Sequence, residues 1–384
     1  MRPPSDGRLN VLYVIWSLQM GGAERVVADL AHGLDRRLFR PLVCCLNFKG
    51  RLAEPLEAEG ISVFALAKRP RFDPRVFIRL VRLIRRERVH VVHTHLWTSS
   101  LWGRLAAVWA RVPVVVVTEH NLDIWRRALH LLADRLLARF TDDWIFVSRE
   151  VETFYRTRLP IPESRAHVVH NGVDLAPFAH PHDQAAVRAR MGLPAAARVV
   201  GVVGRLENRK GHRYFVEAMA TVASRFPGAI GIIIGEGKEK GALVAQREAL
   251  GLADTLHLVG YWPDLAEALC AIDVFVLPSL MEGHPLAVLE AMAAAKPVVA
   301  TAVGGNVEAV EPGITGLLVP PAAPAPLAGA ILELLLDPDR ATKLGAAGRR
   351  SLERRFSLPS AVRANEEIYS RRYREKIGEA SLGD

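Results

Sequence analysis

Two glutamates, Glu282 and Glu290, carry the clearest chemical signal in this 384-residue sequence. The segment 274–293 (VFVLPSLMEGHPLAVLEAMA) reads as a buried strand, a short loop and a helix, and Pro285 suits the first helical position. Glu282 then lies in the loop, while Glu290 lies inside the helix among apolar neighbours. The alternative is that Glu282 caps the helix and that Glu290 faces solvent.

The start of this helix predicts an anion site. The first N–H groups of a helix have no partner within it, and the helix dipole favours negative charge there. We therefore expect a phosphate at the amides between Glu282 and the first helical turn. The residues concerned are Gly283, His284, Pro285 and Leu286.

A second candidate loop follows the apolar run 199–203. Gly204 provides a turn, and the cations Arg205 and Lys210 stand on either side of a short loop. Arginine offers a planar fork of donors and lysine a point charge, a combination that suits a diphosphate. The alternative is that both are surface residues of a loop between strand and helix.

Two features of the first half of the chain also point to a ligand. The first predicted strand leads to Gly21 and Gly22 before a helix, which lets backbone amides approach a ligand closely. His120 follows a buried strand, where it could bind a sugar hydroxyl or simply pack.

Two other motifs argue against other classes of protein. His93 and His95 have the spacing of metal ligands, but no Asp or Cys cluster nearby completes a tetrahedral set, so we expect no metal. Gly235 and Gly237 begin like a dinucleotide fingerprint, but Lys240 takes the place of its third glycine. This departure argues against a dehydrogenase.

The elements that position these residues alternate between strand and helix, which predicts parallel sheets with helices on both faces. We expect two α/β domains, residues 1–177 and 185–358, with a helical tail, 360–384, that packs on the first. Open sheets of this kind bind ligands beyond the carboxyl ends of their strands, which predicts a central cleft between the domains. The predicted strands are 9–16, 41–46, 61–65, 89–93, 114–118, 144–147, 198–203, 230–234, 255–259, 274–277 and 298–301.

Composition excludes several classes of protein. The sequence is 50% hydrophobic and 24% charged, which is typical of globular domains and not of disordered chains. Its three cysteines fit no disulfide framework and indicate a cytoplasmic protein. No apolar run approaches the roughly 18 residues of a membrane span. The formal charge of +9 lies wholly in residues 1–177, which hold 27 basic and 18 acidic residues.

A cationic amphipathic helix is predicted after residue 73. Four arginines recur on one face, opposite an apolar side, and the basic segment Lys68–Arg71 precedes them. Contact with anionic lipid headgroups is one interpretation, and a solvated outer helix is the other. Six of the seven tryptophans lie in the same half, where some could anchor at a membrane interface. The four arginines are Arg75, Arg79, Arg82 and Arg86.

Together these residues resemble the retaining GT-B glycosyltransferases called glycosyltransferase family 4, or glycosyl transferases group 1. The resemblance covers nearly the whole chain, and its most specific part is the Glu-x7-Glu motif. It implies a GT-B architecture of two Rossmann-like parallel-sheet domains. Other matching segments are Gly21-Gly22, Asn171-Gly172-Val173-Asp174, Gly204-Arg205-Leu206, Lys210-Gly211, Lys296-Pro297 and Gly304-Gly305.

The resemblance also implies roles for single residues. Arg205 and Lys210 would hold the donor diphosphate, Glu290 the nucleotide ribose, and Glu282 with the neighbouring amides the transferred sugar. His120 matches the family's histidine near that sugar. The sequence departs from the family where His284-Pro285 replaces the commoner Phe-Gly and where Ala295 replaces a glycine.

The sequence thus predicts a retaining glycosyltransferase that moves a sugar from a nucleotide sugar to a lipid-linked, polysaccharide or other glycan acceptor. We expect neither a metal nor another cofactor, because cations and helix amides can stabilise the leaving diphosphate. We expect no nucleic-acid partner, since no such motif is present. The expected location is the cytoplasm, with peripheral contact to the inner face of the membrane. Two rival functions are a nucleotide-sugar epimerase and a non-catalytic protein that binds sugar nucleotides or polyanions.

Overall fold

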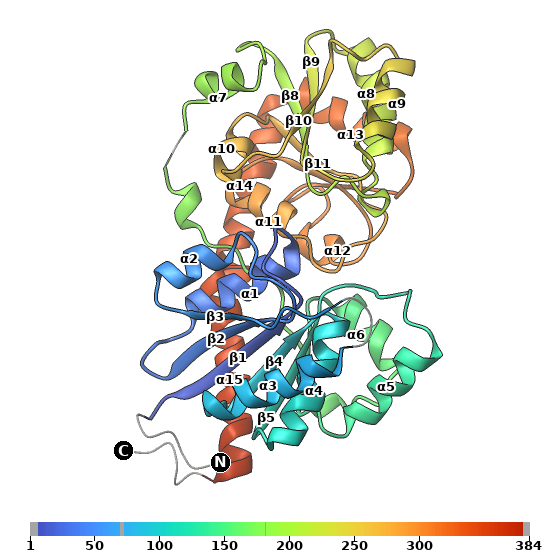
Figure 1. The fold of residues 1–384 in the computed structure, drawn as a ribbon. Coiled ribbons are helices and arrows are strands. Elements are labelled where there is room, and N and C mark those ends of the chain that lie inside the picture. The colour runs from blue at the N-terminus through green and yellow to red at the C-terminus, as the bar shows by residue number, and fades with distance from the viewer. Residues whose placement is uncertain (1–6, 70–72, 181, 379–384) are drawn as a thin grey trace. The chain divides into compact units, whose positions relative to one another are not determined.

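The computed structural model describes residues 7–69, 73–180 and 182–378, which form two units (Figure 1). The first unit comprises residues up to Gly172 together with those from Leu358 onward, and the second comprises Val173–Ser357. The second unit begins before the predicted end of the first domain at residue 177. The reason is that Val173 forms a bridge with Ser357 at the other end of the second unit.

The first unit is built on a seven-stranded parallel sheet in the order β3-β2-β1-β4-β5-β6-β7. Six strands were predicted, and the structure adds β7, a half-buried edge strand of three residues. A strand so short has too few apolar residues to be recognised from the sequence. The strands are β1 (Leu9–Ile15), β2 (Phe39–Cys45), β3 (Ser62–Ala65), β4 (Val91–His95), β5 (Val114–Glu119), β6 (Asp143–Phe146) and β7 (Ala166–Val168).

Helices cover both faces of this sheet. Alternate residues of a strand point to opposite faces. Accordingly, Val11 and Tyr13 of β1 share a buried cluster with the helices on one face, α1, α2 and α15, whereas Leu12 and Val14 share a cluster with α3 and α4. The helices of the first unit are α1 (Gly22–Gly33), α2 (Ala53–Ala58), α3 (Pro74–Arg86), α4 (Trp97–Ala110), α5 (Ala128–Ala138), α6 (Arg149–Arg156), the 3-10 turn η1 (Glu163–Arg165) and α15 (Leu358–Ile377).

The second unit has a six-stranded parallel sheet in the order β10-β9-β8-β11-β12-β13. Five strands were predicted, and the three-residue edge strand β13 was missed for the same reason as β7. Two parallel sheets with helices confirm the predicted fold class. The strands are β8 (Arg198–Val203), β9 (Ala229–Ile234), β10 (Leu256–Gly260), β11 (Val274–Leu277), β12 (Val298–Thr301) and β13 (Leu317–Val319).

Two buried clusters flank the second sheet. Helices α8 and α13 pack on one face, through residues such as Met219 and Ile331, while α10 and α11 pack on the other, and α14 contributes residues to both clusters. The helices of the second unit are η2 (Ala176–Phe178), α7 (Gln184–Arg190), η3 (Asn208–Lys210), α8 (His212–Arg225), α9 (Lys240–Ala249), α10 (Leu265–Cys270), α11 (Leu286–Ala293), α12 (Asn306–Ala309), α13 (Pro324–Leu336) and α14 (Pro338–Arg355).

The C-terminal helix α15 belongs to the first unit, although it follows the second in sequence. Its Tyr369 and Tyr373 are fully buried against the first sheet. Arg372 donates to both carboxylate oxygens of Asp143 at 2.7 Å, and Lys376 lies 2.6 Å from Asp142. These contacts fix the last turns of α15 to β6 and the residue before it.

Helix α3 has the predicted amphipathic form. Its arginines Arg75, Arg79, Arg82 and Arg86 are exposed, and the opposite side is buried against the sheet and α4. Asp73 caps the helix by accepting from the N–H of Arg75.

The predicted basic segment Lys68–Arg71 is corrected in part. Lys68 is buried: its ammonium group lies 5.4 Å from the Trp16 ring and donates to the carbonyl of Arg69. Burial with its ammonium group beside a tryptophan ring makes this lysine part of the interior, so it cannot contact a membrane. Arg69 is exposed, and residues 70–72, including Arg71, lie outside the described residues.

Candidate active site

The best candidate site of the second unit lies on two loops that leave neighbouring strands. Strands β8 and β11 are adjacent, but the chain continues from β8 to β9, which pairs with the opposite edge of β8. The order of strands therefore reverses between β8 and β11, and ligands of open α/β sheets bind outside the carboxyl ends at such a point. The amide of Leu280 donates to the carbonyl of Arg209 at 2.8 Å, which ties the two loops together.

Lys210 and Glu282 meet between these loops. The Nζ atom of Lys210 lies 2.6 Å from Oε1 of Glu282, and the hydroxyl of Ser279 donates to the same oxygen at 2.6 Å. The side chains of Glu282 and Lys210 are only 5% and 15% exposed. A cation and a carboxylate are thus held in one place with little access to water, where electrostatic interactions are strong.

Two glycines lie so close to the backbone of the loop with Glu282 that no side chain would fit at their positions. Gly211 has φ of +66°, and a Cβ atom there would lie 2.0 Å from the carbonyl oxygen of Pro278. Gly304, with φ of +50°, follows β12, and its Cβ would lie 1.8 Å from the carbonyl oxygen of Glu282. Any other residue would push the loops apart, so both glycines are required for the position of Glu282 and Lys210.

Arg205 is oriented by a different carboxylate. Its side chain is 51% exposed, and its Nη1 lies 3.4 Å from Glu207, whose other oxygen accepts from Arg209 at 3.0 Å. Partial burial alone would raise the pKa of Glu207, but the charges of Arg205 and Arg209 outweigh it and hold that pKa below its usual value. Glu207 therefore stays ionised and keeps Arg205 beside the loop that carries Lys210.

Helix α11 begins one residue later than predicted, because Pro285 is its N-cap and Leu286 its first residue. Proline lacks an N–H, so the amides that can face an anion here are those of Gly283, His284 and Leu286. Glu290 lies inside the helix and is half-buried, with buried apolar residues on both sides of it in the sequence. The structure thus places the glutamates on one loop and on the helix that follows it.

In the first unit, the predicted ligand residues lie at the carboxyl ends of their strands. Gly21 is the N-cap of α1, which follows β1, and Gly22 is its first residue. His120 directly follows β5, and its Nε2 lies 2.9 Å from Nδ1 of His95 at the end of β4. Burial lowers the pKa of His120 to about 4 and lowers the pKa of His95 as well, so both rings are neutral at pH 7. One ring must therefore donate to the other.

Both ring nitrogens of His93 contact side chains of the protein. Its two ring nitrogens lie 2.6 Å from the hydroxyl groups of Tyr369 and Thr118, and burial lowers its pKa to about 3. Among the residues that the structure describes, no group of three or more His, Cys, Asp or Glu side chains could hold a metal ion.

One sequence motif of metal-dependent glycosyltransferases is present elsewhere. Asp337 and Asp339 form an Asp-x-Asp pair, the kind of pair used to hold a metal on a diphosphate. Both residues are exposed at the start of α14, and the Asp337 carboxylate accepts from the N–H of Arg340 at 3.0 Å. Asp337 therefore has a structural role as the cap of α14.

Two residues that contact predicted site residues were not themselves predicted, Ser279 in the second unit and His95 in the first. Ser279 follows the buried strand β11 and its Pro278 directly, a position that already indicates the ligand-binding edge of the sheet. His95 was considered only as a metal ligand, and its contact with His120 depends on the pairing of β4 with β5.

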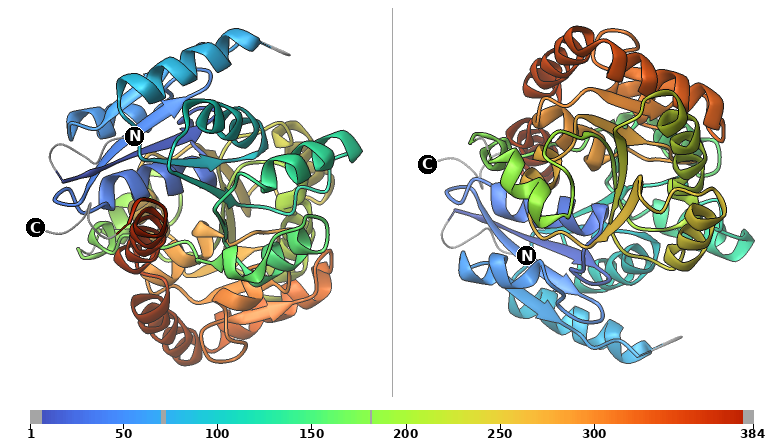
Figure 2. Two further views of the ribbon diagram at one scale, coloured as in Figure 1. Left: turned by 90° about the horizontal axis from the view of Figure 1, so that it is seen from below. Right: turned by 90° about the horizontal axis from the view of Figure 1, so that it is seen from above.

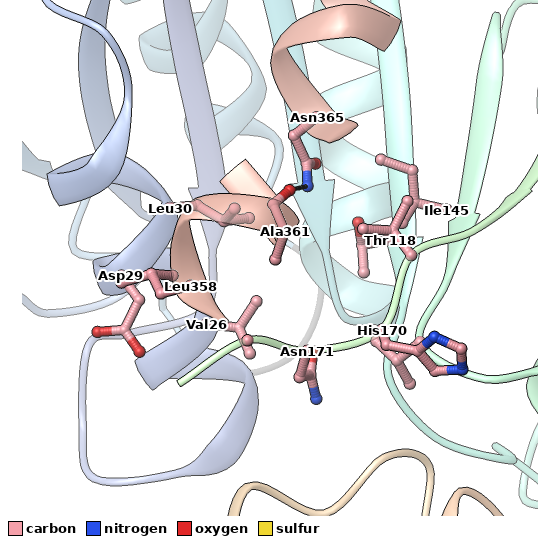
Figure 3. Close-up of a pocket in the computed structure, with 13 residues that line it drawn as sticks. Val26, Asp29, Leu30, Thr118, Ile145, His170, Asn171, Leu358, Ala361 and Asn365 are labelled. Carbon is pink, nitrogen blue, oxygen red and sulfur yellow. Dashed lines mark hydrogen bonds between the residues drawn. The ribbon is translucent and has the colours of Figure 1, made fainter. Parts of the chain in front are cut away.

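A separate small hollow lies in the first unit, beside α1, α15 and the segment 169–172 (Figure 3). Its volume is about 20 Å³. This is room for about one water molecule and too little for a sugar. None of the predicted site residues lines it.

Comparison with known proteins identifies the family. The family described as Glycosyl transferases group 1 matches residues 183–351, and that described as Glycosyltransferase Family 4 matches residues 20–177. The 2-deoxystreptamine N-acetyl-D-glucosaminyltransferase of Streptomyces fradiae is 36% identical over 95% of this chain and 93% of its own length. The chain is a GT-B glycosyltransferase.

One further relative and one solved structure are also similar to this chain. The UDP-Gal:alpha-D-GlcNAc-diphosphoundecaprenol alpha-1,3-galactosyltransferase of Escherichia coli is 32% identical over 64% of this chain and 66% of its own length. The crystal structure of Anabaena Alr3699/HepE in complex with UDP and glucose matches 95% of this chain and all of its own, with a TM-score of 0.85 and 24% identity. The latter supports the GT-B fold that the sequence predicted.

Glu290 is expected to affect the binding of nucleotides by this glycosyltransferase. A carboxylate held by ribose hydroxyls contributes about 1.5–3 kcal/mol, so Glu290→Gln should weaken nucleoside diphosphate binding about ten- to hundredfold. Calorimetric titration with UDP, GDP and ADP measures this. Glu248→Gln, which changes an exposed glutamate of α9, is the matched control. Unchanged affinity in Glu290→Gln would show that the residue is only structural.

Proposed function

We propose that this glycosyltransferase moves a sugar from a nucleotide sugar to a glycan or lipid-linked acceptor, with retention of anomeric configuration and without a metal. The observation that carries the proposal is the pair of Lys210 and Glu282, 2.6 Å apart on the loops that leave β8 and β11. Lys210 and Arg205 would bind the donor diphosphate, Glu290 the ribose, and Glu282 with the amides of Gly283, His284 and Leu286 the transferred sugar.

The chemistry of sugar transfer explains why such groups are needed. Positive charge develops on the anomeric carbon as the bond to the diphosphate breaks, and negative charge develops on the leaving diphosphate. Fixed cations and helix-terminal amides stabilise the second charge without reorganisation. Lys210 is already held by Glu282, whose carboxylate is fixed in turn by the hydroxyl of Ser279, so little freedom is lost when a diphosphate binds. His120 would then contact the transferred sugar through a neutral ring.

The donor and acceptor classes rest on the relatives. The galactosyltransferase of E. coli is named for UDP-Gal and for an acceptor linked to diphosphoundecaprenol, and Anabaena Alr3699/HepE was crystallised with UDP and glucose. We propose a donor of the same nucleotide-sugar class, with the acceptor held by the first unit. The basic excess of residues 1–177 suits an acceptor that carries phosphate groups or lies near anionic lipid.

Peripheral contact with the inner face of the cell membrane belongs to this proposal. Arg75, Arg79, Arg82 and Arg86 of α3 are exposed on one side and can approach anionic headgroups. Within the described part of the chain, we find no helix with the length and apolarity required to span a bilayer.

Metal independence can be tested with a chelator. Because Lys210 and Arg205 would supply the positive charge, we expect that EDTA leaves the rate of sugar transfer unchanged within about twofold and that added Mg²⁺ or Mn²⁺ does not raise it. The rate is measured as nucleoside diphosphate released in the presence of acceptor. Loss of activity with EDTA and recovery with either ion would contradict the metal-free mechanism.

The same reaction mixtures report the anomeric configuration and exclude the two rival functions. If configuration is retained, the NMR coupling constant of the anomeric proton should indicate the same anomeric configuration in the product as in the donor. Conversion of the donor sugar without any acceptor would instead indicate an epimerase. Binding of nucleotide sugars with no turnover on any acceptor would indicate a binding protein.

A further inference from the structure

Helix α5 of the first unit exposes a row of large apolar side chains. Leu129, Leu132 and Leu136 are 80%, 51% and 51% exposed, and their spacing places them on one side of the helix. Ile124 and Trp125 before the helix and Phe140 after it are also more than half exposed. Exposed apolar residues grouped in this way mark a surface that contacts another molecule.

A groove lined by arginines adjoins the end of this helix. It is open, has a volume of about 700 Å³, and lies between the end of α5, the end of α6 and the turn η1 before β7. Four arginines line it together with apolar residues and two prolines. The arginines are Arg135, Arg139, Arg158 and Arg165.

The positive charge of this arginine groove is not balanced by nearby carboxylates. Arg135 donates to the carbonyl of Arg158, Arg158 to the carbonyl of Phe154, and Arg165 to the carbonyl of Thr141. No ion pair of the four arginines occurs among the residues that the structure describes.

The acidic residues closest in sequence to the groove have cationic partners elsewhere. Glu163 lies 3.7 Å from Arg156, and Asp142 lies 2.6 Å from Lys376. Buried Asp134 of α5 binds Arg104 and Arg126. The groove thus keeps its charge for an external anion.

We propose that the apolar side of α5 and the arginine groove together form a docking surface for an anionic lipid bilayer. The leucines and Trp125 would enter the boundary between headgroups and acyl chains, while the arginines of the groove hold lipid phosphates. An amphipathic helix that combines exposed leucine and tryptophan with arginine is suited to this position. A soluble polyanion would satisfy the arginines but would leave the apolar row in water, so the two features together favour a membrane.

This surface is distinct from the arginines of α3. Helix α4 packs against both α3 and α5 and separates them in the helical layer (Figure 2). Helix α3 offers positive charge but little apolar surface. Ile78 is the only large apolar side chain among its described residues that is more than a third exposed. Of these two helices, α5 therefore offers the apolar anchor, and α3 would add only electrostatic attraction.

Co-sedimentation of the full chain with vesicles tests this assignment. The vesicles contain phosphatidylcholine alone or with phosphatidylglycerol, at low and at high salt. One variant combines Leu129→Ser, Leu132→Ser and Leu136→Ser, and a second combines Arg135→Gln, Arg139→Gln, Arg158→Gln and Arg165→Gln. The charge-matched control combines Arg75→Gln, Arg79→Gln, Arg82→Gln and Arg86→Gln. Circular dichroism and thermal unfolding show that each variant is folded.

We expect the wild-type chain to bind the anionic vesicles at low salt and each of the first two variants to bind at least tenfold more weakly. The α3 control should lose less affinity than either. Failure of the wild type to bind anionic vesicles would overturn the proposal, as would unchanged binding of the leucine variant. Greater loss in the α3 control than in the groove variant would also overturn it.

Two additional measurements separate a bilayer from other partners. Brominated lipids should quench fluorescence that disappears in Trp125→Phe, since this side chain would reach the acyl boundary. If soluble heparin binds as tightly as the vesicles do and the leucine variant retains both affinities, the surface recognises a polyanion and the proposal is wrong. The vesicle assays contain no nucleotide sugar, so their failure leaves the proposed sugar transfer untouched.

Discussion

Lys210→Ala is expected to lower the turnover of sugar transfer by about a hundredfold or more, since loss of one fixed charge partner of a transition state commonly costs that much. Arg205→Ala should act in the same direction. Lys210 is held 2.6 Å from Glu282 and is largely shielded from water, so its charge is fixed in one place. The measurement is the release of nucleoside diphosphate from the donor in the presence of acceptor.

Removal of this lysine also leaves the buried Glu282 carboxylate without its cation, which tends to destabilise the fold. Lys210→Arg keeps the charge and should keep the melting temperature. It should still lower turnover, because a planar guanidinium does not occupy the position of an ammonium group. Lys343→Ala, which changes an exposed lysine of α14, is the matched control. Wild-type rates in both Lys210 variants would exclude the diphosphate role.

Glu282→Gln is expected to reduce turnover by about a hundredfold while leaving the affinity for free nucleoside diphosphate undiminished. The neutral amide can still accept from Ser279, but it no longer attracts Lys210, which becomes free to pair with phosphate. Steady-state rates and calorimetric titration of the same protein provide the two quantities. A loss of turnover without a loss of diphosphate affinity distinguishes a residue that acts on the transferred sugar from one that binds the nucleotide.

The matched control for Glu282→Gln is Glu248→Gln, which changes an exposed side chain outside the site. Equal losses of turnover and of diphosphate affinity in Glu282→Gln would argue that the glutamate serves only to hold the loop. Unchanged turnover would remove it from the site altogether.

Strong local patterns allowed much of the fold to be predicted. Strands β8, β11 and β12 have the predicted bounds, because each is an apolar run between residues that end a strand. The loop with Glu282 and the helix with Glu290 were also located from the sequence, since Pro285 and the apolar run after it define the helix start.

Features that depend on tertiary packing could not be predicted. The contact of His95 with His120 requires the register of β4 and β5, which no local pattern specifies. Lys68 was predicted to lie beside the arginines of α3 in contact with lipid because it belongs to a basic segment, but it is buried next to Trp16, which is distant in sequence. The exposed leucines of α5 were missed, because leucines on a helix are usually taken to be buried, and only the structure shows which side faces water.

The proposal that the second unit binds a nucleotide sugar through Lys210, Glu282 and Glu290 is tested most directly by thermal unfolding of the full chain. Nucleotide sugars carrying UDP, GDP, ADP or dTDP are added singly at increasing concentration, because a ligand that binds only the folded state stabilises it by about 2.7 kcal/mol at a hundred times its dissociation constant. We predict that at least one raises the unfolding temperature of the wild type and of Lys343→Ala but not of Lys210→Ala. No shift with any nucleotide sugar, or an equal shift in Lys210→Ala, would contradict the account.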